Sequence, residues 1–245
     1  MEKKRTWETT AFFLQIMAMV CMLCDHLWGT VVQGNDWLTC IGRLTFPLYA
    51  FMIVEGFFHT KNRRKYAGRL LLCAVLSEIP FNLAMGSRLF FPIHQNVLWS
   101  FLISLGLICL NEKVKEKRLW LRILVGAASV CIGYVGGIVT FVDYYSAGIL
   151  TVLTFYFFRA RKWWCFIGQL VCMWYINFEI LGGYSYEVSL FGQIHFIERQ
   201  GIALLALIPL WMYRGKQGYH SKWLQFVRYA FYPVHLLILG LIKVL

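Results

Sequence analysis

Three ionisable residues near the start of the chain have types and positions that could support acid–base chemistry. Asp25 and His26 lie at the end of the first long apolar run, and Arg43 lies at the start of the second. A histidine with an ordinary pKa of about 6.5 can act as a general base near neutral pH. Neighbouring residues are about 100° apart on a helix, so Asp25 and His26 are not a dyad by themselves. Asp25 could instead pair with Arg43. Two interpretations therefore stay open: a catalytic base, or an interfacial histidine beside a structural ion pair.

Further polar residues lie close to the ends of later apolar runs. Glu78 and Asn82 are one turn apart on one face of the third run. The later connections contain His94, Gln95 and Asn96, then Asp143, Tyr144 and Tyr145, and then His195, Glu198, Arg199 and Gln200. Because ionisable residues inside a bilayer are costly, each of them is a candidate for function.

A dense basic turn follows the second apolar run. It contains His59, Lys61, Arg63 and Arg64. Such a turn could bind the phosphates of a cytoplasmic cofactor. It could equally be an ordinary basic loop that contacts anionic lipid. Glu55, inside the apolar run before the turn, needs a partner, for which Arg69 and Arg214 are candidates.

The last apolar run contains Pro233 and His235. Proline removes a backbone donor, so we expect a kink in this helix. His235 would then lie near the middle of the membrane. There it could line a cavity or bond a carbonyl that the proline has freed.

Apolar runs fill the rest of the 245-residue chain and predict its fold. Apolar residues make up 59% of the sequence and charged residues 15%, against about 45–50% and 25% in soluble domains. Runs of this length must be helices in lipid, where the backbone satisfies its own hydrogen bonds. The candidate spans are 7–27, 40–58, 66–86, 96–111, 119–137, 146–158, 163–178, 199–213 and 223–243. We therefore predict an all-α, polytopic membrane bundle of about nine helices, forming a single domain over 1–245, with an uncleaved first helix.

The distribution of Lys and Arg predicts the orientation of the bundle. Alternate segments hold 19 of the 24 basic residues: the N-terminus, with Lys3, Lys4 and Arg5, and the connections near 61–69, 113–122, 159–162 and 214–222. The positive-inside rule assigns these segments to the cytoplasm. Nine spans would then place the C-terminus outside. The net charge of +12 is thus mainly a topology signal. Nucleic-acid binding is disfavoured because the basic residues are dispersed among short loops.

Motifs of soluble enzymes and of metal sites are absent from the sequence. It contains no P-loop, no GxSxG and no HExxH motif, and no convincing metal-ligand spacing. Seven of the eight cysteines lie inside apolar runs, which favours packing roles over disulfides.

Several segments, in order along the chain, resemble the TraX family. They are 14–26 (LQIMAMVCMLCDH), 41–56 (IGRLTFPLYAFMIVEG), 59–66 (HTKNRRKY), 77–84 (SEIPFNLA), 94–97 (HQNV) and 231–236 (FYPVHL). The resemblance is weakest over 120–195.

The family's named activity is acetylation of the N-terminus of conjugative pilin. TraX also resembles a wider superfamily of transmembrane acyltransferases, which use a histidine at the outer end of the first span. The resemblance implies that His26 is the catalytic base. One departure is Gln15, which stands where the superfamily often has a basic residue eleven positions before that histidine.

The resemblance and the charge distribution together predict a membrane-embedded acetyltransferase of the bacterial cytoplasmic membrane, with acetyl-CoA as the donor and no metal. In this hypothesis His26 is the base, Asp25 orients Arg43, and Arg43, Asn82 or Asn96 binds the developing oxyanion. We expect acetyl-CoA near Glu55, His59, Lys61, Arg63 and Arg64. We expect the acceptor near Glu78, Asn82, His94, Gln95 and Asn96.

Two other functions compete with this hypothesis. The acceptor outside the cytoplasm could be a glycan or a lipid instead of a pilin-like protein or peptide. Alternatively, Asp25, Glu55, Glu78 and His235 could form the proton or solute path of a transporter, or the chain could be a non-catalytic membrane protein. Transporters often contain repeats and paired broken helices, and the sequence shows neither.

Overall fold

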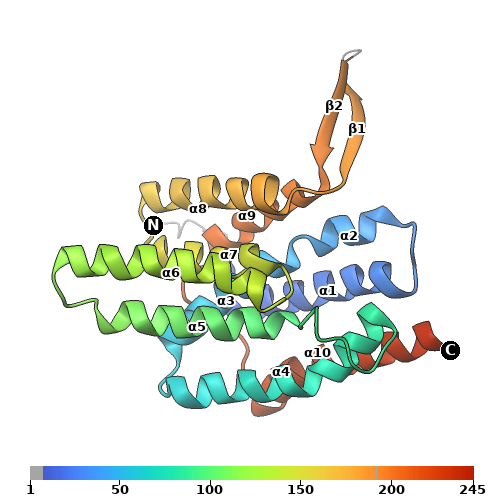
Figure 1. The fold of residues 1–245 in the computed structure, drawn as a ribbon, viewed down its shortest axis with the longest axis horizontal. Coiled ribbons are helices and arrows are strands. Elements are labelled where there is room, and N and C mark those ends of the chain that lie inside the picture. The colour runs from blue at the N-terminus through green and yellow to red at the C-terminus, as the bar shows by residue number, and fades with distance from the viewer. Residues whose placement is uncertain (1–7, 191–192) are drawn as a thin grey trace, which may run out of the picture.

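The computed structural model describes residues 8–190 and 193–245 and is built almost entirely of helices (Figure 1). The helices are α1 (Ala11–Thr30), α2 (Asp36–Gly42), α3 (Thr45–His59), α4 (Arg63–Gly86), α5 (Val97–Lys113), α6 (Leu119–Val139), α7 (Tyr145–Phe157), α8 (Trp163–Tyr175), the π-helix η1 (Ile176–Leu181), the 3-10 helix η2 (Arg199–Ala206), α9 (Leu207–Met212) and α10 (Lys222–Val244). The basic residues Lys3, Lys4 and Arg5, and the first residue of the predicted span 7–27, lie outside the described residues.

Helix length and composition confirm an integral membrane protein of the helical type. In the described part of the chain, six helical segments are long and apolar enough to cross a bilayer: Ala11–Thr30, Asp36–His59, Arg63–Gly86, Leu119–Val139, Trp163–Leu181 and Lys222–Val244. Two shorter apolar helices, Tyr145–Phe157 and Arg199–Met212, correspond to the predicted spans 146–158 and 199–213. The predicted span 96–111 corresponds to α5. Length and composition therefore support six crossings, which is fewer than the nine predicted.

The side chains of α6 are distributed as expected for a lipid-facing helix. Its buried positions are Ser129, Gly133 and Gly137, whereas large apolar side chains such as Val135 are exposed. A Cβ atom on Gly133 would approach Ile149 Cγ2 to 2.7 Å, and one on Gly137 would come within 2.5 Å of a backbone oxygen of α7. Small residues thus allow close helix packing inside the bundle, while the large apolar residues face outward.

A break between α2 and α3 places Arg43 at a helix junction. Pro47 lies in the first turn of α3 and has no N–H to donate to the carbonyl of Arg43, four residues earlier. The two helices share one long apolar segment, Asp36–His59. The predicted second span is therefore present as an interrupted helix, with Arg43 at the interruption.

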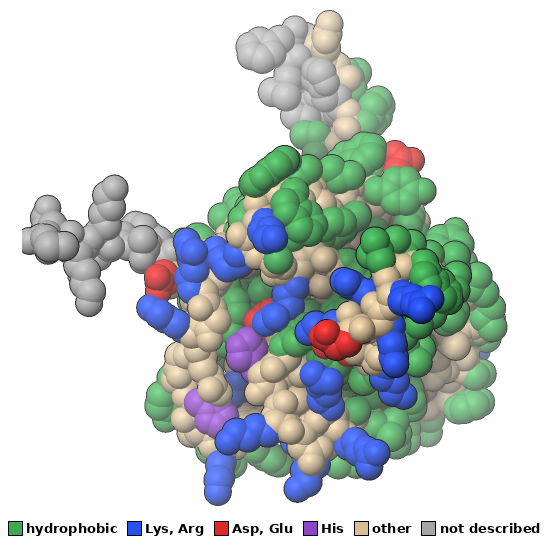
Figure 2. Space-filling view, turned by 90° about the vertical axis from the view of Figure 1, so that its left-hand side faces the viewer, with side chains coloured by type: hydrophobic (Ala, Val, Ile, Leu, Met, Phe, Trp, Pro, Cys, Tyr) green, Lys and Arg blue, Asp and Glu red, His purple; other side chains and the backbone are tan. Residues whose placement is uncertain are grey.

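The four basic connections within the described residues lie at one end of the bundle. They join α3 to α4, α5 to α6, α7 to α8, and α9 to α10, on the left of Figure 1. Figure 2 looks onto this end and shows Lys and Arg side chains gathered over it. We call it the basic end. The turn after α1, the α4–α5 connection and the C-terminus lie at the opposite end.

A β-hairpin, which we did not predict, projects from this opposite end near α2 (Figure 1). Strands β1 (Ser185–Leu190) and β2 (Gln193–Glu198) pair in an antiparallel ladder. Gly182 and Gly183 precede the hairpin and have positive φ angles of 49° and 112°, which other residues rarely adopt. They allow the chain to leave η1 and turn into β1.

Candidate active site

Two cavities occupy the bundle and share part of their lining. The basic-end cavity, of about 360 Å³, is lined by the starts of α1, α4 and α10 and by the end of α3. The His26 cavity, of about 460 Å³, is lined by the end of α1, Arg43, the 143–145 turn and the base of the β-hairpin. Both cavities are lined by Met22, Tyr49, Val97, Phe101 and Tyr232. The two spaces therefore adjoin inside the bundle.

One face of α1 follows both cavities. Gln15, Met19 and Met22 line the basic-end cavity, and Met22 and His26 line the His26 cavity. These positions are three or four residues apart, which is the spacing of residues on one helix face. From Gln15 to His26 the helix rises by about 16 Å at 1.5 Å per residue. His26 thus lies well inside the protein, away from the basic end.

His26 forms a hydrogen bond to His235 on α10. His26 Nδ1 and His235 Nε2 are 2.6 Å apart. The ring centroids are 4.9 Å apart and the ring planes differ by 8°. Because the nitrogens are much closer than the centroids, the rings meet edge to edge in nearly one plane. This contact engages Nδ1, and His26 also lines the cavity.

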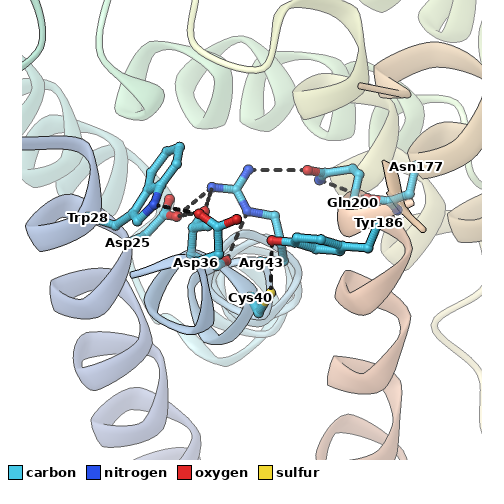
Figure 3. A network of polar contacts seen from close by, with 9 residues as sticks. Asp25, Trp28, Asp36, Cys40, Arg43, Asn177, Tyr186 and Gln200 are labelled. Carbon is cyan, nitrogen blue, oxygen red and sulfur yellow. Dashed lines mark hydrogen bonds and ion pairs between the residues drawn. The ribbon is translucent and has the colours of Figure 1, made fainter. Parts of the chain in front are cut away.

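Arg43 joins three segments at the wall of the His26 cavity (Figure 3). Its Nη2 donates to Asp25 Oδ1 and, at 3.0 Å, to Thr39 Oγ1. Its Nη1 donates to Gln200 Oε1 at 3.2 Å, and its Nε donates to the Thr39 carbonyl at 3.3 Å. Asp25 and Arg43 therefore form the ion pair that the sequence analysis gave as one possibility. A Cβ atom on Gly42 would come within 2.4 Å of Asp25 Cβ, so this glycine permits the close approach.

The same network extends to the base of the β-hairpin. Gln200 donates to Asn177 in the π-helix η1 at 3.1 Å, and Tyr186 in β1 lies 3.5 Å from the Cys40 thiol (Figure 3). The Arg199 guanidinium lies 4.9 Å from the ring centroid of Trp28 and 5.4 Å from that of Tyr184. Cation–π contacts of this kind hold the hairpin base over the His26 cavity. π-Helical segments often occur at functional sites.

A strained turn carries Tyr144 and Asp143 into the same cavity. Phe141, Tyr144 and Tyr145 have φ angles of 52°, 62° and 45°, which is uncommon for large side chains. Backbone hydrogen bonds of 2.8 Å in both directions join Gln95 to this turn. The Tyr144 ring stacks on Phe46 with centroids 4.3 Å apart. Strain of this kind persists only where the surroundings fix the conformation, as Gln95 and Phe46 do here.

His94 is fixed to the turn by Asp143. His94 Nε2 lies 3.3 Å from Asp143 Oδ1, and this hydrogen bond raises the pKa of His94 above its ordinary value, against the opposing effect of burial. The imidazolium form is favoured by the fold. The contact therefore stabilises the protein fully below about pH 6.5, and this stabilisation is lost as the pH rises through the raised pKa.

We expect His94→Gln to lower thermal stability at pH 5.5 and to have little effect at pH 8.5. Both side chains are nearly a third exposed, so we expect a contribution of about 0.5–1 kcal/mol at most. Melting curves of the wild type and the variant across this pH range measure the difference, and Asp143→Asn should show the same pattern. A stability loss that grows with pH would contradict the assignment.

Two guanidinium groups line the basic-end cavity. Arg228 Nη1 on α10 donates to Gln15 Oε1 on α1, and Arg69 Nε donates to the Tyr229 hydroxyl at 3.4 Å. A cation from α10 thus reaches the position at which the superfamily pattern has a basic residue in α1. The sequence could not reveal this, because residues 15 and 228 are far apart along the chain.

The predicted donor-binding residues lie in different places. His59 lines the basic-end cavity, whereas Lys61, Arg63 and Arg64 are exposed on the turn beyond its lining. Arg63 lies over the Phe57 ring, 4.2 Å from its centroid. Glu55 accepts hydrogen bonds from Arg159, the shorter of them 2.7 Å long, and lies 3.5 Å from His59. Its partner is therefore Arg159, and the expectation of Arg69 or Arg214 was wrong.

Of the predicted acceptor-binding residues, His94 lines the His26 cavity and the others do not. Asn96 caps α5 and donates to the Ala74 carbonyl at 2.9 Å and to Glu78 Oε2. Glu78 Oε2 also accepts from Trp99, at 3.0 Å. Asn82 donates to the Leu89 carbonyl at 3.4 Å. These side chains join α4 to α5 and to the loop that follows α4, outside both cavity linings. Two of the three predicted oxyanion ligands, Asn82 and Asn96, are thus turned away.

Two residues that line the cavities, and that we did not predict, carry buried hydroxyl groups without hydrogen-bond partners. Among the described residues, the buried Tyr232 hydroxyl has no acceptor for its proton, and Thr45 Oγ1 is also unpaired. Tyr232 lines both cavities, and Thr45 lines the His26 cavity. Buried polar groups normally have hydrogen-bond partners, so an unpaired one in a cavity wall is a candidate for substrate contact. Within the described residues, no group of three His, Cys, Asp or Glu side chains could hold a metal ion.

Comparison with known proteins shows the family of this chain. The family model described as TraX protein matches residues 11–243. A relative, the probable fimbrial assembly protein FimC of serogroup H1 from Dichelobacter nodosus, is 30% identical over 96% of each chain. No solved structure matches the chain. The match covers α1 and α10, and with them both histidines and both cavities. The chain belongs to the TraX family.

Proposed function

We propose that this protein transfers an acetyl group from cytoplasmic acetyl-CoA to an amine acceptor on the other side of the membrane. The observation that carries the proposal is the pair of adjoining cavities. One of them is lined by guanidinium groups at the basic end, the other by His26, and they meet at Met22 and Tyr232. Such a pair suits a reaction whose two substrates approach from opposite sides.

The topology that we propose places the basic end in the cytoplasm of a bacterial cell and the bundle in its cytoplasmic membrane. The positive-inside rule supports this orientation, because the four described basic connections share one end. The helices at the short spans 96–111, 146–158 and 199–213 run between the same two ends and would complete nine crossings, with the C-terminus outside. The His26 cavity then belongs to the acceptor side.

Arg228 and Arg69 would hold the phosphates of acetyl-CoA in the basic-end cavity. Guanidinium groups bind phosphates in bidentate fashion, and both groups line this cavity. The apolar lining farther in, which includes Met19, Met22 and Phe101, suits an uncharged arm directed toward Tyr232. These residues fit the donor better than the exposed turn at 61–64, which lies beyond the lining.

His26 would act as the general base where the cavities meet. Acetyl-CoA supplies an acetyl group activated as a thioester. His26 Nε2 takes a proton from the acceptor amine as the new C–N bond forms and the C–S bond breaks, and the proton then passes to the departing thiolate. The unpaired Tyr232 hydroxyl would donate a hydrogen bond to the developing oxyanion. Arg43 and Asp25 would hold the end of α1 in place.

The acceptor side would receive a protein N-terminus. The relative from Dichelobacter nodosus is named for fimbrial assembly, which supports a pilin-like acceptor for this chain. Trp28, Tyr144 and Tyr184 line the His26 cavity, and aromatic walls of this kind can enclose an extended peptide end.

Arg228→Ala should raise the KM for acetyl-CoA by about 10- to 100-fold, which corresponds to the loss of one charge-assisted contact of about 1.5–3 kcal/mol. Arg228→Lys should recover part of the loss. Arg118→Ala is the matched control, because Arg118 is exposed at the same end outside the cavity lining. Steady-state kinetics with a thiol-reactive dye would measure KM. Equal effects at Arg118 and Arg228 would show that only the general positive charge matters.

Binding and turnover by the purified protein test the proposed function. Isothermal titration with acetyl-CoA should detect one site, and free thiol should appear when a peptide with an unblocked N-terminus is added. The same peptide with an acetylated N-terminus should give no thiol. Absence of acetyl-CoA binding would contradict the proposal.

A further inference from the structure

A chain of hydrogen bonds behind His26 fixes the positions of its protons. His235 Nδ1 lies 2.5 Å from the carbonyl oxygen of Phe231, one turn earlier on α10. His235 Nε2 lies 2.6 Å from His26 Nδ1. His235 is only 6% exposed and is not part of the cavity lining. It therefore lies behind His26, on the side away from the cavity.

The carbonyl of Phe231 determines which nitrogen of His235 carries the proton. A carbonyl oxygen only accepts hydrogen bonds, so His235 Nδ1 must be the donor. A neutral imidazole carries one N–H, which leaves His235 Nε2 as an acceptor. His26 Nδ1 must then donate to it. The same rule leaves His26 Nε2 without a proton, with its lone pair available to the cavity.

His235 also keeps this arrangement free of additional charge. A carboxylate in its place would equally accept from His26, but it would bring a negative charge into the bundle. The nearest carboxylate in sequence, Asp25, is already engaged by Arg43 and Thr39. Pro233 does not account for the contact. The carbonyl that it leaves without a helical donor is that of Tyr229, which lies 3.5 Å from the Cys73 thiol.

We propose that His235 is a positioning residue that holds His26 in the Nδ1–H tautomer, so that His26 Nε2 faces the substrates as a base. The tautomer follows from the hydrogen bonds alone. Its catalytic consequence rests on the proposed function. When His26 takes up a proton at Nε2, the hydrogen bond from Nδ1 to His235 also stabilises the imidazolium.

The tautomer can be measured directly by NMR. In protein labelled with ¹⁵N-histidine, two-bond ¹H–¹⁵N correlations distinguish Nδ1–H from Nε2–H, and the signal of His26 is assigned with His26→Gln. We expect His26 to be protonated on Nδ1 in the wild type. His235→Gln should preserve this tautomer, because a glutamine oxygen reaches the position of Nε2 and accepts. In His235→Leu, His26 should shift to a mixture of the two tautomers. A wild-type His26 protonated on Nε2 would overturn the proposal.

Kinetics separate the positioning role from simple packing. His235→Leu should lower kcat by about 10- to 100-fold, the usual effect of losing a residue that orients a catalytic group. The KM for acetyl-CoA should stay unchanged, and His235→Gln should restore most of kcat. If Leu and Gln lower kcat equally while both variants stay folded, the tautomer has no catalytic role. If His26→Ala retains full activity, the proposed function fails, whereas the NMR result still decides the tautomer.

Discussion

Replacing His26 with alanine should lower acetyl transfer by about 10²- to 10⁴-fold, the range for loss of a general base. His26 lines the cavity that adjoins the basic-end cavity, and its Nδ1 is engaged by His235. Among the described residues, the other histidine that lines the His26 cavity is His94, and its Nε2 is engaged by Asp143. Product formation should be followed by mass spectrometry of the acceptor peptide, with acetyl-CoA in excess.

The effect of His26→Ala should be on turnover and not on donor binding. Acetyl-CoA affinity should therefore match that of the wild type in isothermal titration. Val20→Ala is the matched control on the same helix, because Val20 is exposed on the face of α1 turned away from the cavities. Unchanged turnover in His26→Ala, in a protein that still binds acetyl-CoA, would exclude His26 as the base.

Arg43→Ala should cost about 3 kcal/mol of stability as well as most of the activity. The change leaves the Asp25 carboxylate without its ionic partner, and breaking a buried pair typically costs about 3–5 kcal/mol. The lower end applies because both side chains retain some exposure, 16% and 17%. The same change removes the contacts to Thr39 and Gln200, which join α2 and η2 to the end of α1. Unfolding in mixed micelles would measure the stability.

Two further variants separate charge from geometry at this position. Arg43→Lys keeps the charge but loses the planar fork that reaches Asp25, Thr39 and Gln200 together, so activity should stay low while part of the stability returns. The double variant Asp25→Asn with Arg43→Gln removes both charges and should be more stable than Arg43→Ala. If the double variant is the less stable of the two, the ion pair is not the source of the effect.

The sequence was sufficient to predict the membrane fold because the apolar runs and the basic loops are local signals. Each predicted span corresponds to one helix or to two successive helices, with bounds that differ by a few residues. The hairpin over 185–198 was missed, because a short two-stranded hairpin between two apolar helices gives no strong alternating pattern. The break at Arg43 depends on Pro47, whose effect on the residue four positions earlier is readable only once the helix register is known.

The candidate site was only partly predictable, for a different reason. His26, Asp25 and Arg43 belong to neighbouring segments, and their types alone pointed to them. His235, Arg228 and Tyr232 come from the last helix and reach the first through tertiary packing, which no local pattern encodes. Glu78 and Asn96 drew attention as costly polar residues in a membrane segment, but a hydrogen bond from Asn96 to Glu78 Oε2 joins them between α4 and α5. A buried polar residue can thus serve as a structural link between helices instead of a site residue.

Transfer across a sealed bilayer tests the central claim most directly. The protein is reconstituted in liposomes that contain a peptide with a free N-terminus, and radiolabelled acetyl-CoA is added outside. Molecules whose basic end faces outward should acetylate the enclosed peptide, while acetyl-CoA stays outside and His26→Ala liposomes stay inactive. Labelled peptide inside the liposomes is the predicted result. If acetylation occurs only when peptide and acetyl-CoA are on the same side of the bilayer, the two cavities do not connect the two faces of the membrane, and the account is contradicted.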